Sequence, residues 1–280
     1  MKNAKRSVEG VVVPLVTPVK ENGEIDFRGL ETLVGWLARK GIDGVFVAGT
    51  TGRFSHFSPA QNGKICRVVT AVVGGTLTVY GGCCDSGLHR TLANAELMKK
   101  AGADMAVVTA PYYLSYSIQE AEANLERVLD SSPLPVILYN IPEFIGYSLR
   151  PEWLESVSEH PNAVGYKDST NDLEHHLDVL KRTKGKIFSV LIGKELLLSA
   201  AFVAGARGLV LSFANVFPEP FVELVKAARI SDWETVEKNQ QIAREIVENF
   251  LLKRTGKYFS SLMLYLQQEF HNRGIDLRLL

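Results

Sequence analysis

The 280-residue chain contains little cysteine, no excess of either charge and no long hydrophobic run. Its three cysteines, Cys66, Cys83 and Cys84, are odd in number and include an adjacent pair. They make a poor disulfide framework and lack the Cys-x-x-Cys spacing of a zinc site. A reducing compartment fits best, so we expect a cytoplasmic protein. Cys83 and Cys84 follow a strand-like run, where they either fill space or line a pocket.

Acidic and basic residues balance at 31 each, with no run of five or more like charges. A nucleic-acid or anionic-membrane partner is therefore not expected. Residues 1–7 are basic but lead into a short apolar stretch interrupted by Pro14 and Pro18, which fits neither a signal peptide nor a membrane span. With 46% hydrophobic residues, the chain is long enough to bury a large core.

One local pattern occurs three times, at residues 40–47, 101–108 and 204–211: a helix-like stretch ending at glycine, a short turn and an apolar run. Glycine just past a helix supplies the left-handed cap, and an apolar strand after it must be covered on both faces. The pattern predicts alternating helices and parallel strands.

The apolar runs predict about eight strands within roughly 210 residues, separated by amphipathic stretches, which matches a (β/α)8 TIM barrel better than an open sheet. We expect residues 1–216 to form a barrel catalytic domain. Residues 217–280 have helical periodicity and predict a C-terminal helical extension packed on the barrel. The expected strands are residues 10–16, 45–48, 77–81, 105–109, 135–139, 163–167, 187–192 and 209–212.

The expected sixth strand ends in a lysine, Lys167. An ammonium on a buried strand costs several kcal/mol unless it is paired or loses its proton. A neutral buried amine is a nucleophile that condenses with ketones, so the position indicates Schiff-base chemistry on a carbonyl substrate. The alternative is a lysine whose stem is buried while its amine reaches solvent.

Three motifs, one of which contains Lys167, lie at the carboxyl ends of expected strands, where TIM barrels carry their chemistry. They are Gly-Thr-Thr-Gly at 49–52, Tyr-Asn-Ile-Pro at 139–142 and Gly-Tyr-Lys-Asp at 165–168. In this order and spacing they resemble the dihydrodipicolinate synthase and N-acetylneuraminate lyase superfamily. Its members are class I, Schiff-base-forming, pyruvate-dependent aldolases and lyases. The resemblance runs from about residue 10 to residue 216.

The resemblance implies roles for individual residues. Lys167 would form the imine and Tyr139 would act as general acid and base. The hydroxyl chain would include Thr50 and Tyr113, the latter contributed by a neighbouring subunit, whereas Tyr112 would pack. The backbone and hydroxyls at Gly49, Thr50 and Thr51, in a glycine-flanked turn at a helix start, would hold the pyruvate carboxylate.

Gly193 and Val210 are expected pocket walls. Lys194 is the rival nucleophile, since it also follows a strand, but it opens an expected helix at 195–204 where an exposed lysine is usual. By the same resemblance no metal or diffusible cofactor is required, and the partners are pyruvate and an aldehyde, or a 2-oxo acid. The assembly would be a homotetramer, built as a dimer of dimers.

Two departures from the family pattern bear on the second substrate. Arg53 stands where many relatives carry glutamate, and Phe144 stands where true synthases place the arginine that grips aspartate semialdehyde. A phenyl ring cannot donate a hydrogen bond to a carboxylate. We therefore expect a substrate of the 2-oxo-3-deoxy sugar acid type, with Arg53 and His56 either reading an acceptor tail or serving the surface. The synthase itself, a hydratase-aldolase and a catalytically silent keto-acid-binding barrel remain as alternatives.

Overall fold

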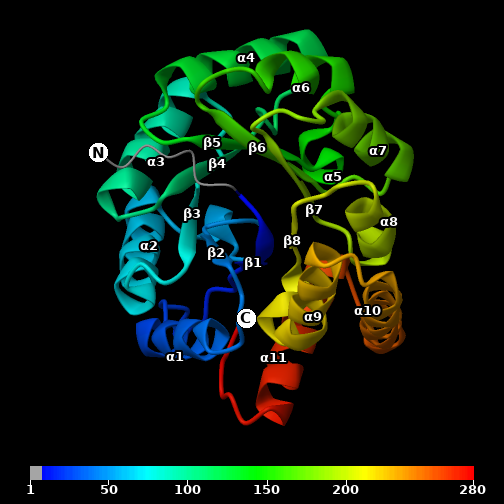
Figure 1. Ribbon diagram of the computed structural model, residues 1–280. Helices are drawn as coiled ribbons and strands as arrows, with labels where there is room; N and C mark the ends of the chain where they lie inside the picture. Colours follow the sequence, from blue (N-terminus) through cyan, green and yellow to red (C-terminus); the bar gives the residue numbers. More distant parts are fainter. Residues whose placement is uncertain (1–7) are drawn as a thin grey trace.

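A closed ring of eight parallel strands forms the centre of the molecule (Figure 1). The computed structural model describes residues 8–280, so the prediction for the basic segment 1–7 lies outside the described residues. Neighbouring strands pair in chain order and β8 closes on β1, which confirms the predicted TIM barrel. The strands are β1 (Gly10–Pro14), β2 (Gly44–Val47), β3 (Thr78–Gly82), β4 (Met105–Thr109), β5 (Val136–Asn140), β6 (Ala163–Asp168), β7 (Ser189–Ile192) and β8 (Gly208–Val210).

All eight expected runs contain a strand, because each is apolar enough to be covered on both faces. The expected bounds were wrong by two residues at three places, the first being the end of β1 at Pro14 rather than at residue 16. Strand β7 begins at Ser189, since Ile187 is 71% exposed, and β8 ends before Ser212, which begins the 3-10 turn η3 (Ser212–Asn215). The predicted helix at 195–204 is divided into the 3-10 turn η2 (Glu195–Leu197) and α8 (Leu198–Val203).

Helices surround the strand ring and link each strand to the next (Figure 1). The glycines of the repeated pattern, Gly41, Gly102 and Gly205, all have positive φ, as left-handed residues after a helix require. The linking helices are α1 (Phe27–Ala38), α2 (Pro59–Val73), α3 (Leu88–Lys100), α4 (Ile118–Ser131), α5 (Pro142–Ile145), α6 (Pro151–Val157), α7 (Leu173–Arg182) and α8.

Three helices follow the last strand: α9 (Pro218–Arg229), α10 (Trp233–Lys253) and α11 (Tyr258–Asn272). Helix α9 packs against β1 and α10, and α10 in turn packs against α8 and α11. By its position after β8, α9 serves as the eighth helix of the ring. The predicted boundary at residue 216 would place α9 in the C-terminal extension. We propose instead that α9 belongs to the barrel and that the extension begins after it.

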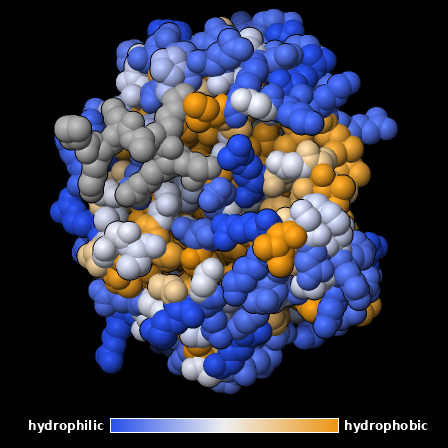
Figure 2. All heavy atoms as spheres, viewed as in Figure 1, coloured by the Kyte–Doolittle hydropathy of each residue, from blue (hydrophilic) through white to orange (hydrophobic). Residues whose placement is uncertain are grey.

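Hydrophilic residues cover most of the face shown in Figure 2, with hydrophobic residues in smaller groups between them. Among residues 8–280, no helix is both long enough and apolar enough to cross a bilayer.

Candidate active site

Lys167 lies at the carboxyl end of β6 and points into the barrel. Together with barrel residues that include Phe46, Leu191 and Val210, it lines a very small internal cavity. The side chain is only 6% exposed, with its Nζ atom 3.9 Å from the ring centroid of Tyr139 and 5.3 Å from that of Phe46. The amine therefore does not reach solvent.

Burial lowers the pKa of Lys167 to about 7, and the nearby positive charge of Lys194 contributes in the same direction. The negative charges of ionised Cys84 and Glu195 would oppose this shift. Much more of the amine is then neutral at neutral pH than in an ordinary lysine, and the neutral form is the one that attacks a carbonyl carbon.

Tyr139 is the neighbour of Lys167 in the strand register, and Thr109 is the neighbour of Tyr139 on the other side. Three reactive or polar side chains therefore stand in a row across β4, β5 and β6. Burial raises the pKa of Tyr139 to about 12, although hydrogen bonds with the hydroxyls of Thr50 and Ser169 oppose the rise. The resting phenol thus keeps its proton and is linked to Thr50. Ser169 is a hydroxyl partner that sequence reasoning missed.

Strand β2 is followed by a turn rather than by a helix. The turn carries Gly49, Thr50 and Thr51, and the next regular elements are the 3-10 turn η1 (Phe54–His56) and then α2. The expectation of a helix start at the two threonines is therefore wrong: Arg53 adopts a left-handed conformation, with φ of 56°, that prevents α-helix continuation. A Cβ atom at Gly49 would lie 2.7 Å from the Phe46 ring, so this approach requires glycine. The Thr51 hydroxyl lies 2.8 Å from that of Ser212, a second partner that was not expected.

Gly193 lies directly beside the reactive lysine. A Cβ atom there would be 2.4 Å from Oγ of Ser169, 2.8 Å from the Asp168 carbonyl and 3.4 Å from Cε of Lys167. Val210 lines the same small internal cavity as Lys167. The structure therefore brings both expected wall residues to the lysine, whereas Lys194 is only partly buried and stands just before η2.

A buried pair holds the carboxyl end of β6. Oδ2 of Asp168 lies 2.9 Å from Nδ1 of His176 on α7, and both side chains are fully buried. Oδ1 of Asp168 accepts a hydrogen bond from the backbone N–H of Thr170. The residue after Lys167 is thus fixed to the backbone and to a neighbouring helix, which limits the freedom of the lysine backbone.

A pocket of about 280 Å³ opens at the carboxyl ends of β2, β4 and β5. We call it the outer pocket. It begins at Thr50 and Thr109, next to Tyr139, and the structure places Arg53, His56 and Phe144 among its walls. Its eleven lining residues are Thr50, Arg53, Phe54, Ser55, His56, Thr109, Tyr112, Ile141, Phe144, Ile145 and Phe259.

Tyr113 does not join the site within its own subunit. It is 95% exposed, has a positive φ of 77°, and is followed by Leu114 at 60% exposure. Tyr112, by contrast, packs edge to face against Phe54 at a centroid distance of 6.3 Å and lines the outer pocket.

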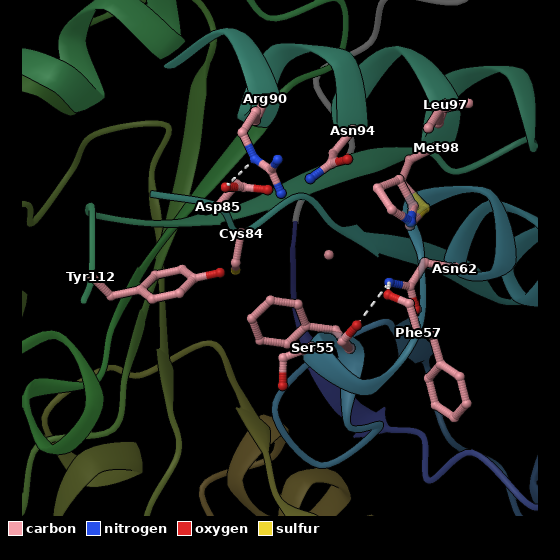
Figure 3. A pocket seen from close by; sticks show the side chains of 13 residues that line it. Ser55, Phe57, Asn62, Cys84, Asp85, Arg90, Asn94, Leu97, Met98 and Tyr112 are labelled. Atoms are coloured by element: carbon pink, nitrogen blue, oxygen red, sulfur yellow. Dashed lines mark hydrogen bonds and ion pairs between the residues drawn. The ribbon is translucent and has the colours of Figure 1, made fainter. Parts of the chain in front are cut away.

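A second cavity, of about 170 Å³, shares Phe54, Ser55 and Tyr112 with the outer pocket (Figure 3). Cys84 lines it and the Tyr112 hydroxyl points toward this thiol, so one of the paired cysteines does line a pocket. Burial raises the pKa of both Cys83 and Cys84, which keeps them as thiols. Among the described residues, no group of three or more His, Cys, Asp or Glu side chains is arranged to hold a metal ion.

A sequence model of the dihydrodipicolinate synthetase family matches residues 7–270. The chain is 34% identical over 229 residues to an uncharacterized DapA-like lyase of Pyrobaculum islandicum, covering 80% of this chain and 75% of the relative. It is 29% identical over 227 residues to a 4-hydroxy-tetrahydrodipicolinate synthase of Anaeromyxobacter dehalogenans, covering 81% and 77%.

Solved structures of proteins from the same family have a similar fold. YagE of Escherichia coli K12, a prophage protein of the dihydrodipicolinic acid synthase family solved in complex with pyruvate, superposes with a TM-score of 0.90 at 26% identity, covering 97% of this chain and 90% of that chain. The dihydrodipicolinate synthase of Bacteroides thetaiotaomicron superposes with a TM-score of 0.88 at 30% identity, covering 96% and 90%.

Proposed function

The chain belongs to the dihydrodipicolinate synthetase family, whose members are pyruvate-dependent class I lyases, and we propose that its reaction proceeds through an imine between pyruvate and Lys167. The observation that carries this proposal is a fully enclosed lysine whose pKa falls to about 7, in contact with the ring of Tyr139. Pyruvate in the YagE complex supports the choice of keto acid.

In the proposed mechanism the neutral amine of Lys167 attacks the C2 ketone, and water leaves from the resulting carbinolamine. Tyr139 supplies the proton for the departing hydroxyl, since its high pKa keeps it protonated beforehand. In the cleavage direction the iminium then accepts the electron pair of the breaking C3–C4 bond, while Tyr139 takes the proton of the C4 hydroxyl. Reprotonation at C3 and hydrolysis release pyruvate and restore the amine. The iminium serves as the electron sink, so the mechanism calls for neither a metal nor a diffusible cofactor.

The carboxylate of pyruvate would lie at the turn after β2. The backbone N–H groups and hydroxyls of Thr50 and Thr51 lie there, beside the glycine that allows the close approach to Phe46. Gly193, without a side chain, leaves room for the ketone next to Cε of Lys167.

Tyr113 would complete the proton path from a neighbouring subunit. Its 95% exposure and strained backbone, together with exposed Leu114, fit a loop tip that enters another copy of the chain. The homotetramer expected from the family resemblance would supply that copy.

The sequence predicts a substrate of the 2-oxo-3-deoxy sugar acid type, with dihydrodipicolinate synthase or hydratase-aldolase activity as alternatives. Phe144 stands in the wall of the outer pocket, so the arginine that would grip aspartate semialdehyde is replaced there by an apolar ring. Phe144 therefore argues against the synthase reaction, although relatives carry that name. A silent keto-acid binder is the least supported alternative, because the site holds lysine, tyrosine and threonine together.

Borohydride trapping tests the proposal. Reduction in the presence of pyruvate should add one reduced pyruvyl unit, found by peptide mass spectrometry on the peptide that carries Lys167. Lys167→Ala should abolish the adduct and lower turnover by more than about a hundredfold. Lys194→Ala is the matched control and should still be labelled. A label on Lys194, or none on wild-type protein that binds pyruvate, would contradict the proposal.

A further inference from the structure

The outer pocket is the place where a second substrate would meet a pyruvyl group on Lys167. It starts at Thr109, which the strand register places beside Tyr139, and Tyr139 stands beside Lys167. Its volume of about 280 Å³ is at the small end for ligand pockets, which favours a compound with one ring or a short branched chain.

Most of the wall is hydrophobic. Six of its eleven residues carry aromatic or aliphatic side chains, and they come from four separate parts of the chain: Phe54, Tyr112, the segment with Ile141, Phe144 and Ile145, and Phe259 of α11. Ile141 and Ile145 are 8% and 6% exposed, whereas the Phe144 ring is 52% exposed at the rim. A concave surface built from such side chains gains most from an apolar ligand that displaces water from it.

The polar groups of the wall can pair with only a few hydroxyls of a polyhydroxylated chain, although Nε of Arg53 and Oγ1 of Thr109 are buried without a hydrogen-bond partner among the described residues. Thr50 is hydrogen-bonded with Tyr139, and Arg53 donates from Nη2 to the Thr17 carbonyl at 3.2 Å. Ser55 and His56 are exposed, on the loop before α2. A sugar-like acceptor would bring several hydroxyls against the phenylalanine and isoleucine side chains, and each hydroxyl left unpaired there lowers its affinity.

We propose that the acceptor aldehyde has a hydrophobic body, aryl or branched alkyl, seated among Phe54, Tyr112, Ile141, Ile145 and Phe259. This inference rests on the proposed imine at Lys167. In the forward step the pyruvyl enamine carbon attacks the aldehyde carbon and a C–C bond forms. The carbonyl π electrons move to the aldehyde oxygen, which takes a proton from Tyr139, and water then hydrolyses the iminium to a 4-hydroxy-2-oxo acid. No oxidant or reductant is needed.

Competition between acceptors tests the inference. With saturating pyruvate, kcat/KM is measured for benzaldehyde, D-glyceraldehyde and aspartate semialdehyde, with products identified by mass spectrometry. We expect benzaldehyde to be preferred over both others by roughly tenfold or more, since even small hydrophobic differences in a pocket discriminate to that extent. A preference for D-glyceraldehyde or aspartate semialdehyde would overturn the inference.

Borohydride trapping with pyruvate alone, on the same preparation, tests the imine at Lys167 separately from the class of acceptor. Absence of a pyruvyl adduct on Lys167 refutes the proposed function itself. An adduct together with poor use of benzaldehyde refutes only the acceptor class.

Variants locate the acceptor in the outer pocket. Phe259→Ala should lower kcat/KM for benzaldehyde roughly ten- to hundredfold while leaving D-glyceraldehyde turnover and pyruvate trapping within about twofold. Leu264→Ala is the matched control, because Leu264 lies on the same helix, is 51% exposed and does not line the outer pocket. If Phe259→Ala fails to fold, Phe144→Ser at the exposed rim should show the same selective loss. Equal losses for both aldehydes in either variant would contradict the assignment.

Discussion

The reactivity proposed for Lys167 depends on the surroundings of its ammonium group, because these decide how readily the amine loses its proton. The amine lies over the face of Tyr139 with 6% of its side chain exposed, so water cannot stabilise the ammonium, and π faces replace only part of that hydration. Cys84 and Glu195 could oppose this only when ionised, and burial raises the pKa of both groups, which disfavours their charged forms. The barrel interior thus favours a neutral nucleophile without any dedicated base.

The first prediction at this scale is the pH dependence of imine formation. The pKa of Lys167 is lowered to about 7, so the reactive neutral amine is the minor form below that pH and the major form above it. The rate of borohydride-trapped adduct formation at low pyruvate concentration should therefore rise with pH through an inflection near 7 and then level. Arg53→Asn, at a neighbouring left-handed position that asparagine tolerates, serves as a control and should keep the same inflection. An inflection near the ordinary lysine value would contradict the burial argument.

Tyr139→Phe is the second residue-scale prediction. The ring would still pack against Phe46 and Lys167, whereas the hydrogen bonds with Thr50 and Ser169 would be lost. We expect kcat to fall by about 10²–10⁴-fold, the usual contribution of a general acid and base, with trapping still detectable. Stopped-flow and single-turnover measurements give the chemical step directly. An unchanged kcat would remove Tyr139 from the mechanism.

At the scale of elements, the site is assembled by strand ends. The register places Thr109, Tyr139 and Lys167 in one row, and the β7 end brings Gly193 against that row. Apolar runs and glycine caps were sufficient to predict the strands from the sequence, because strands buried on both faces tolerate few polar residues. The helix expected at Thr50 was wrong, since the left-handed conformation of Arg53 is a local backbone choice that no side-chain pattern encodes.

Gly193→Ala is the prediction that belongs to this scale. The new methyl group would meet the Asp168 carbonyl and Ser169 Oγ at distances that force β6 and β7 apart, and it would press on Cε of Lys167. We expect trapping with pyruvate to fall by roughly tenfold or more, with the fold retained by circular dichroism. Gly35→Ala is the control: it lies within α1, the nearest atom to its added methyl is 3.7 Å away, and it should preserve both trapping and stability. If Gly193→Ala forms as much trapped adduct as wild type, then β6 and β7 move apart without displacing the amine of Lys167.

On the scale of the whole molecule, the C-terminal helices contribute to the site as well as covering the barrel. Phe259 lies in the first turn of α11 and lines the outer pocket, more than ninety residues after Lys167 in the chain. Sequence periodicity predicted these helices but not this contact, because a long-range packing contact leaves no local signal. Ser169 and Ser212 were missed for a related reason: serines after strands are common, and only the three-dimensional arrangement pairs them with Tyr139 and Thr51.

The last prediction concerns assembly, through the exposed tyrosine of the loop after β4. If Tyr113 acts in a neighbour's site, subunits that each lack one group should complement each other. Lys167→Ala and Tyr113→Phe are each expected to be impaired as homomers. In a co-expressed mixture, sites with Lys167 of one subunit and Tyr113 of its neighbour re-form, and activity should return to roughly a quarter of wild type if pairing between two subunits is random.

Tyr112→Phe replaces Tyr113→Phe in the control mixture, because Tyr112 packs within its own subunit and cannot be supplied by another. Light scattering on the same samples gives the oligomeric state. A fully active monomer, or a mixture no more active than the average of its two parents, would place the proton path within a single chain and leave the exposed Tyr113 loop without a catalytic role.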